Sequence, residues 1–134
     1  MLLRLKIRNF LSFFEETVFD MFPNPKRASF PNHIYGEMAV PLLKQAAIYG
    51  ANGSGKSNFI KAIGFIKSFV TNEDFLKNLD LDAYIFQLKT VKQSKINFEI
   101  EFFIKGKYFI YKLEIDKKSI QESLYQSGLE QNTD

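Results

Sequence analysis

The sequence contains no cysteine, no tryptophan and a single histidine, His33. Without cysteine the chain can form no disulfide, no thiolate zinc site and no cysteine nucleophile. One histidine cannot supply the two or three imidazoles of a His₂ or His₃ metal centre within one chain. These absences exclude the common zinc sites and thiol chemistry, and they fit a reducing compartment.

Long apolar runs and a strong charge of one sign are also absent. No run reaches the ~18–20 residues that cross a bilayer, and the first ten residues lack the apolar core of a signal peptide. We therefore expect a cytoplasmic protein without a membrane partner. The net charge of +3 is too small to indicate nucleic-acid binding by itself. Basic residues on the first strand leave nucleic acid open as a partner: Arg4, Lys6 and Arg8.

The four prolines are confined to one stretch, from Pro23 to Pro41. Proline is excluded from helix interiors and central strands. Residues 22–41 are therefore predicted to form a long surface loop, and His33 is predicted to be a loop residue. A length of 134 residues suits one domain, so we expect a single domain over residues 1–134.

Alternation of apolar and polar residues predicts strands near both ends of the chain. It is strict from Leu3 to Ile7, which predicts a half-buried strand. Residues 17–19 predict a second strand. The period changes to two again after Ala83, so residues 83–125 are predicted to form an antiparallel sheet region with a tight turn at Gly106-Lys107. The polar tail, residues 126–134, is expected to fray.

A short strand and a helix are predicted between these regions, which makes the fold class α/β. Residues 43–49 predict a strand that is mostly buried from Ala46 onward. After Ser57, apolar residues recur every three or four positions and predict an amphipathic helix of about four turns. Its predicted apolar face consists of Phe59, Ile60, Ala62, Ile63, Ile66, Phe69 and Val70.

The turn between that strand and that helix carries the chemistry. Residues 50–57, GANGSGKS, match G-x-x-x-x-G-K-[ST] at every fixed position. Glycines let the backbone close around a phosphate, and the helix that follows presents its positive end to it. Lys56 is expected to reach the β- and γ-phosphates of ATP, and the Ser57 hydroxyl is expected to ligate Mg²⁺. The predicted nucleotide-binding residues are Asn52, Gly53, Ser54, Gly55, Lys56, Ser57 and Asn58.

The loop and its surroundings resemble the ATPase heads of the SMC, RecF and OLD group of ABC-type ATPases. Residues 49–58 are similar to their G-x-N-G-x-G-K-S-N/T loop. Residues 7–13, IRNFLSF, are similar to their I-x-N-F-[KR]-S-[FY] start, with Leu11 where a basic residue is common. In that group this start supplies part of the nucleotide pocket. Residues 98–125 resemble the antiparallel subdomain of bacterial OLD-like ATPases, many of which act in phage defence.

The resemblance implies a P-loop NTPase core fragment, the N-terminal part of an ABC-type head, with an antiparallel β-meander. It implies the remainder of a larger ATPase, or a second head in a homodimer, as the partner. In such heads a glutamine between the loop helix and the second half often meets Mg²⁺. Gln87 lies in that region, with Gln93 as a weaker competitor. A surface glutamine at the start of a strand is an equal alternative for Gln87.

Two motifs of ABC-type heads are missing from the sequence. The first is a Walker B run of four apolar residues ending in Asp-Glu. The closest stretch, residues 109–116, is interrupted by Lys112 and Glu114. The second is the Ser-Gly-Gly signature. We therefore identify no catalytic residue and expect the N-terminal part of a larger ATPase or a natural truncation.

Two other functions remain open. The first is a non-catalytic nucleotide-sensing or interaction module that uses ATP to gate assembly. The second, a P-loop kinase or GTPase, is disfavoured because the sequence has neither a lid arginine cluster nor an Asn-Lys-x-Asp motif.

Overall fold

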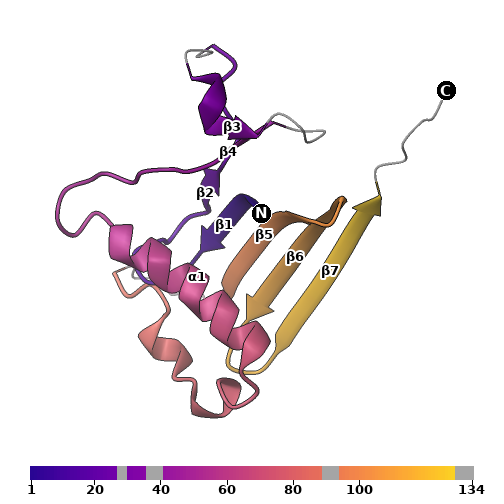
Figure 1. Ribbon diagram of the computed structural model, residues 1–134. Helices are drawn as coiled ribbons and strands as arrows, with labels where there is room; N and C mark the ends of the chain where they lie inside the picture. Colours follow the sequence, from indigo (N-terminus) through magenta and orange to yellow (C-terminus); the bar gives the residue numbers. More distant parts are fainter. Residues whose placement is uncertain (27–29, 36–40, 89–93, 129–134) are drawn as a thin grey trace.

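The computed structural model describes residues 1–26, 30–35, 41–88 and 94–128. Its centre is a five-stranded antiparallel sheet with the order β2-β1-β5-β6-β7. Helix α1 crosses one face of this sheet (Figure 1). These elements span β1 (Leu2–Arg8), β2 (Thr17–Asp20), α1 (Lys56–Thr71), β5 (Ile96–Ile104), β6 (Lys107–Ile115) and β7 (Ile120–Gly128). The predicted antiparallel meander is present as β5-β6-β7.

A second, two-stranded sheet occupies part of the proline-rich stretch. Strand β3 (Ile34–Tyr35) pairs with β4 (Leu42–Leu43), and the 3₁₀ helix η1 (Pro31–His33) precedes β3. Residues 22–41 are therefore not loop throughout. The reason is that Pro31 stands at the first turn of η1, where its fixed φ is favourable. The paired residues of β3 and β4 are not prolines.

Two further 3₁₀ turns follow α1, at η2 (Leu76–Asn78) and η3 (Leu81–Ala83). The second turn ends at Ala83, where the predicted 83–125 sheet region starts, but the first strand of that region begins only at Ile96. At its other end β7 continues to Gly128. Residues 126–128 are therefore ordered by pairing with β6 and are not frayed, while residues 129–134 lie outside the described part. No helix in the described ranges is long and apolar enough to cross a membrane.

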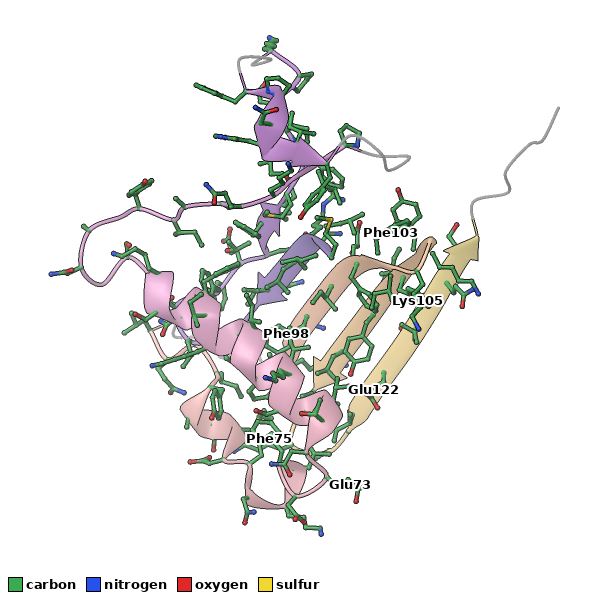
Figure 2. The ribbon with its side chains drawn as sticks, in the orientation of Figure 1. Glu73, Phe75, Phe98, Phe103, Lys105 and Glu122 are labelled. Atoms are coloured by element: carbon green, nitrogen blue, oxygen red, sulfur yellow. The ribbon has the colours of Figure 1, made fainter. Side chains whose placement is uncertain are left out.

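The core lies between α1 and the sheet. Alternation along β1 points Leu5 and Ile7 toward the helix, where both are fully buried. Phe65, in the middle of α1, contacts the ring of Phe98 on β5 at a centroid distance of 5.5 Å and that of Phe75 at 5.2 Å. Figure 2 shows Phe98 on the sheet face that α1 covers. The helix is therefore anchored by aromatic packing.

The apolar face predicted for α1 was wrong in part. The buried residues are Ala62, Phe65 and Ile66, whereas the side chains of three predicted members are exposed: Ile60 by 63%, Ile63 by 36% and Val70 by 60%. These three lie on a different side of the helix from Phe65, because successive residues are ~100° apart around an α-helix. The helix thus carries a second apolar stripe, made of Ile60, Ile63 and Val70, beside the one that packs on the sheet.

The strand predicted over residues 43–49 was also wrong. Pairing ends at Leu43, and residues 44–50 have no regular structure and are exposed. In Figure 1 this segment arcs away from the sheet between β4 and α1. A central strand forms only where neighbouring strands satisfy its backbone, and no described strand runs beside this segment. Its apolar side chains remain in solvent, with Ile48 43% and Tyr49 90% exposed.

The hairpin between β5 and β6 turns one residue earlier than predicted. β5 ends at Ile104 and β6 begins at Lys107, so the turn consists of Lys105 and Gly106. Their φ values are 50° and 79°. Two consecutive positive φ values are the geometry of the two-residue turns that match the twist of antiparallel strands.

The face of the sheet opposite α1 carries a charge ladder. Lys6 on β1 and Lys112 on β6 both pair with Glu99 on β5, with N–O distances of 2.8 and 3.1 Å. Arg4 pairs with Glu101 at 3.4 Å. Burial opposes ionisation of Glu99, but the hydrogen bonds from the two lysines outweigh it and lower its pKa. The basic residues singled out on the first strand therefore serve partly as partners of acidic groups.

We predict that Glu99→Gln destabilises the protein by about 1–2 kcal/mol near neutral pH, because two lysines lose their carboxylate partner. A depressed carboxyl pKa stabilises the fold above its ordinary value of 4.5, and that contribution is lost as the pH falls through the folded-state pKa. The gap between wild type and variant should therefore shrink below about pH 4. Urea unfolding across a pH series measures it, with the exposed Glu73→Gln as the control. A gap that stays constant with pH would contradict the ladder.

Candidate nucleotide-binding site

Residues 50–55 form a tight loop that leads directly into α1. Gly53 and Gly55 adopt left-handed backbone with φ values of 81° and 95°, which glycine adopts without strain. A Cβ on Gly50 would lie 2.4 Å from Ser54 Oγ, and one on Gly55 would lie 2.9 Å from Ser12 Oγ. The glycines of the motif are thus required by backbone angle and by close packing.

The Lys56 side chain turns back over this loop. Its Nζ donates to the carbonyl oxygens of Gly50 at 2.5 Å and Ala51 at 2.7 Å, and it lies 3.4 Å from Ser54 Oγ. The ammonium group is therefore held against the loop by its carbonyls. Gly50 and Ala51 contribute acceptors that the predicted set, beginning at Asn52, did not include. Both residues belong to the G-x-x-x-x-G-K-[ST] motif, and that membership could have predicted their place in the site.

The amino end of α1 opens toward the same loop. The first helical hydrogen bond runs from Phe59 N to Gly55 O at 3.0 Å, and no side chain caps the helix start at Gly55. The first amides of an α-helix have no partner within the helix, and they attract anions. Ser57 is exposed in this first turn, so its hydroxyl is open to solvent. This donor set fits a phosphate group.

A turn after β1 packs against the loop. Asn9 is fully buried with a φ of 54°, and its Nδ2 donates to Lys95 O at 2.9 Å. Leu11 N donates to Tyr84 O at 2.6 Å. Directly after these two anchors, Ser12 Oγ accepts a hydrogen bond from Asn58 Nδ2 at 3.0 Å. The IRNFLSF stretch thus reaches the loop helix through Ser12, and Asn9 holds the turn in place.

Gln87, the predicted Mg²⁺-contacting glutamine, lies on the segment that supports this turn. Its Nε2 donates to Asp82 O at 2.8 Å and Ile85 O at 3.0 Å. The neighbouring Phe86 ring contacts Phe14 at 5.3 Å, just beyond the turn. The amide nitrogen is therefore used locally, and a metal role for the amide oxygen stays a prediction. Gln93 lies outside the described residues.

Carboxylates in the stretch closest to a Walker B run have structural partners. Glu114 accepts hydrogen bonds from Lys95 and Asn97, and these bonds lower its pKa. Asp116 accepts from the backbone amides of Lys118 and Ser119, which lower its pKa as well. Within the described ranges, no group of three His, Cys, Asp or Glu residues could hold a metal ion. A cation at this loop would depend on Ser57 and on oxygens of the phosphate ligand.

We predict opposite effects for two glycine-to-alanine changes at α1. Gly55→Ala forces a side chain into left-handed backbone beside Ser12 and should destabilise the protein by about 1–2 kcal/mol. Gly64→Ala, where a Cβ meets nothing within 4 Å, should stabilise it by about 0.5–1 kcal/mol through helix propensity. Thermal unfolding measures both. Equal midpoints for Gly55→Ala and wild type would show that the loop does not hold this geometry.

One comparison with known proteins gives a match. The family model described as "AAA domain, putative AbiEii toxin, Type IV TA system" matches residues 46–133, which is more than half of the chain. The matched region begins just before the glycine-rich loop and includes α1 and the β5-β6-β7 meander. No curated protein matches the chain.

Proposed function

The chain belongs to this family of AAA domains and is a P-loop nucleotide-binding domain of the ATPase type, and from that premise we propose that it binds ATP with Mg²⁺ through residues 50–58. The observation that carries this proposal is the Lys56 ammonium held over a glycine loop at the open amino end of α1. We further propose an ABC-type head of the SMC, RecF and OLD group, acting in the cytoplasm. The IRNFLSF turn against the loop supports that assignment.

The residues of the loop have distinct proposed roles. Lys56 exchanges its carbonyl acceptors for the β- and γ-phosphates, because charge-assisted hydrogen bonds to phosphate are the stronger ones. The loop amides and the first turn of α1 hold the remaining phosphate oxygens. Ser57 and, as a second oxygen ligand, Gln87 hold Mg²⁺, which neutralises phosphate charge when bound. Asn58 keeps the helix start aligned through Ser12.

Lys56→Ala should weaken ATP binding by about ten- to a hundredfold. The substitution removes a charge-assisted contact worth about 1.5–3 kcal/mol, and 1.4 kcal/mol is a factor of about ten. Titration with a fluorescent ATP analogue measures the affinity. Lys67→Ala, an exposed lysine further along α1, is the matched control and should bind like wild type. Equal affinities for Lys56→Ala and wild type would overturn the assignment of Lys56.

We propose that further protein completes the core beside the loop, either the remainder of a larger ATPase or a second head. Two features support this. Residues 44–50 are exposed and belong to no sheet in the described structure, and the stripe Ile60, Ile63 and Val70 leaves apolar surface of α1 in solvent. Parallel strands beside residues 44–50 would cover both. Backbone pairing and apolar burial would then stabilise the segment that carries the loop.

The 134-residue chain alone should hydrolyse ATP poorly. Hydrolysis needs an oriented water as well as stabilisation of the transferring phosphoryl group. Lys56, Ser57 and the loop amides serve the second need, while Glu114 and Asp116 are engaged elsewhere. A steady-state phosphate-release assay tests this. Turnover near ~1 s⁻¹, ordinary for competent enzymes, that Lys56→Ala abolishes would reveal a carboxylate that this proposal lacks.

The alternative, a nucleotide-sensing module that gates assembly without hydrolysis, shares the same binding site. It is favoured by the engagement of both candidate carboxylates in structural hydrogen bonds. Hydrolysis measured with the longest natural form of the protein separates the two functions. An ATPase turns over there, whereas a sensor binds ATP and leaves it intact.

A further inference from the structure

The two edges of the five-stranded sheet are built differently. Strand β2 is four residues long, whereas β7 has nine residues and pairs with β6 over its whole length without a bulge. On its other side, β7 has no partner among the described strands. In an antiparallel strand, half of the backbone N–H and C=O groups point to each side. One side of β7 therefore presents a long, regular row of hydrogen-bonding groups to solvent.

Strand β7 also lacks the features that usually protect an edge. Proteins block edge pairing with lysine, proline, bulges or short strands. The sequence of β7, IQESLYQSG, has no lysine, arginine or proline, and its only charged residue is Glu122. Large apolar side chains are exposed along it: Ile120 by 44%, Leu124 by 61% and Tyr125 by 58%. The edge thus offers both backbone groups and apolar surface to another strand.

We propose that β7 pairs antiparallel with β7 of a second copy of this chain, which joins two five-stranded sheets into one. One register uses all nine residues. It pairs Ile120 with Gly128 and sets Leu124 opposite the same residue of the other copy. Paired residues share a face of a sheet, so this register places both α1 helices on the same side of the joined sheet.

The side chains of β7 complement each other in that register. Glu122 lies opposite Gln126, whose amide can donate to the carboxylate, and Leu124 packs against its own copy. A parallel in-register pairing would instead oppose Glu122 to Glu122, and like charges directly across a ladder destabilise it. Tyr111 Oη donates to Glu122 Oε1 at 2.5 Å, which holds this carboxylate in place on the helix side of the sheet. The Glu122–Gln126 pairing and the avoidance of a Glu122–Glu122 pair therefore favour a second copy in antiparallel orientation.

The dimer leaves the nucleotide site open. β7 lies at the opposite edge of the sheet from β2, while the glycine loop and the start of α1 lie on the β2 side (Figure 1). The pairing is therefore separate from the partner proposed beside residues 44–50. A single pair of nine-residue strands buries less accessible surface than the ~1,200–2,000 Å² that stable protein–protein interfaces bury. We therefore expect a reversible dimer with a dissociation constant in the micromolar range.

Sedimentation velocity over a range of protein concentrations tests the proposal, without nucleotide. Wild type should pass from monomer to dimer. Leu124→Lys and Leu124→Glu should each stay monomeric, because each sets two like charges opposite one another across the two-fold axis. An equimolar mixture of the two variants should dimerise again, because Lys then faces Glu. This restoration requires residue 124 to face its own copy.

Val18→Lys is the matched control, since Val18 is also apolar and 49% exposed but lies on β2, at the opposite edge of the sheet. It should dimerise like wild type. A monomeric wild type, a dimeric Leu124→Lys or a monomeric Val18→Lys would each overturn the proposal. Circular dichroism checks that the variants fold. Amide exchange of residues 120–128 in wild type gives a test without variants: it should slow at high protein concentration, and unchanged exchange would also overturn the proposal.

Discussion

The packing of Phe65 holds the described elements together. Its ring contacts Phe10 in the turn after β1, Phe75 and Tyr84 beyond the helix, and Phe98 on β5, all with centroid distances of 5.0 to 5.5 Å. Aromatic pairs at such distances add to the free energy of burial itself. One side chain of α1 thereby fixes the helix against the sheet, the turn and the segment that follows the helix.

The position of the glycine loop follows from that junction. Phe10 belongs to the turn that also contains Asn9 and Ser12, so packing of Phe10 against Phe65 fixes the turn relative to α1. Ser12 then lies against Gly55 and accepts from Asn58. The segment before the loop belongs to no described strand, and residues 44–50 are exposed. The geometry of the loop is therefore set from the helix side, through the turn, and not by the segment that precedes it.

The sequence predicted those features that depend on local pattern. Strict alternation over Leu3–Ile7 located β1, and alternation after Ile96 located the meander. The glycine-rich motif located the loop. The errors have a shared cause, which is that burial depends on neighbours that a local pattern does not contain. Residues 43–49 have the apolar pattern of a buried strand, but a strand forms only beside adjacent strands. Ile60 and Val70 were predicted to be core residues because apolar spacing does not say which side of a helix meets the sheet.

The hydrogen bonds that shape the site could not be predicted from local sequence patterns. Asn58 and Ser12 are 46 positions apart, and Asn9 bonds a carbonyl 86 positions away. No periodicity links residues so distant, so only the family resemblance pointed to the turn.

A local sequence pattern also cannot distinguish the two exposed apolar surfaces of the domain, one on α1 and one on β7. Apolar residues of the helix stripe and of β7 look alike in sequence, yet the fold places one group on the outer side of α1 and the other at an edge of the sheet. Contacts made by β7 need not disturb the glycine loop, because the loop lies on the β2 side and β7 forms the opposite edge.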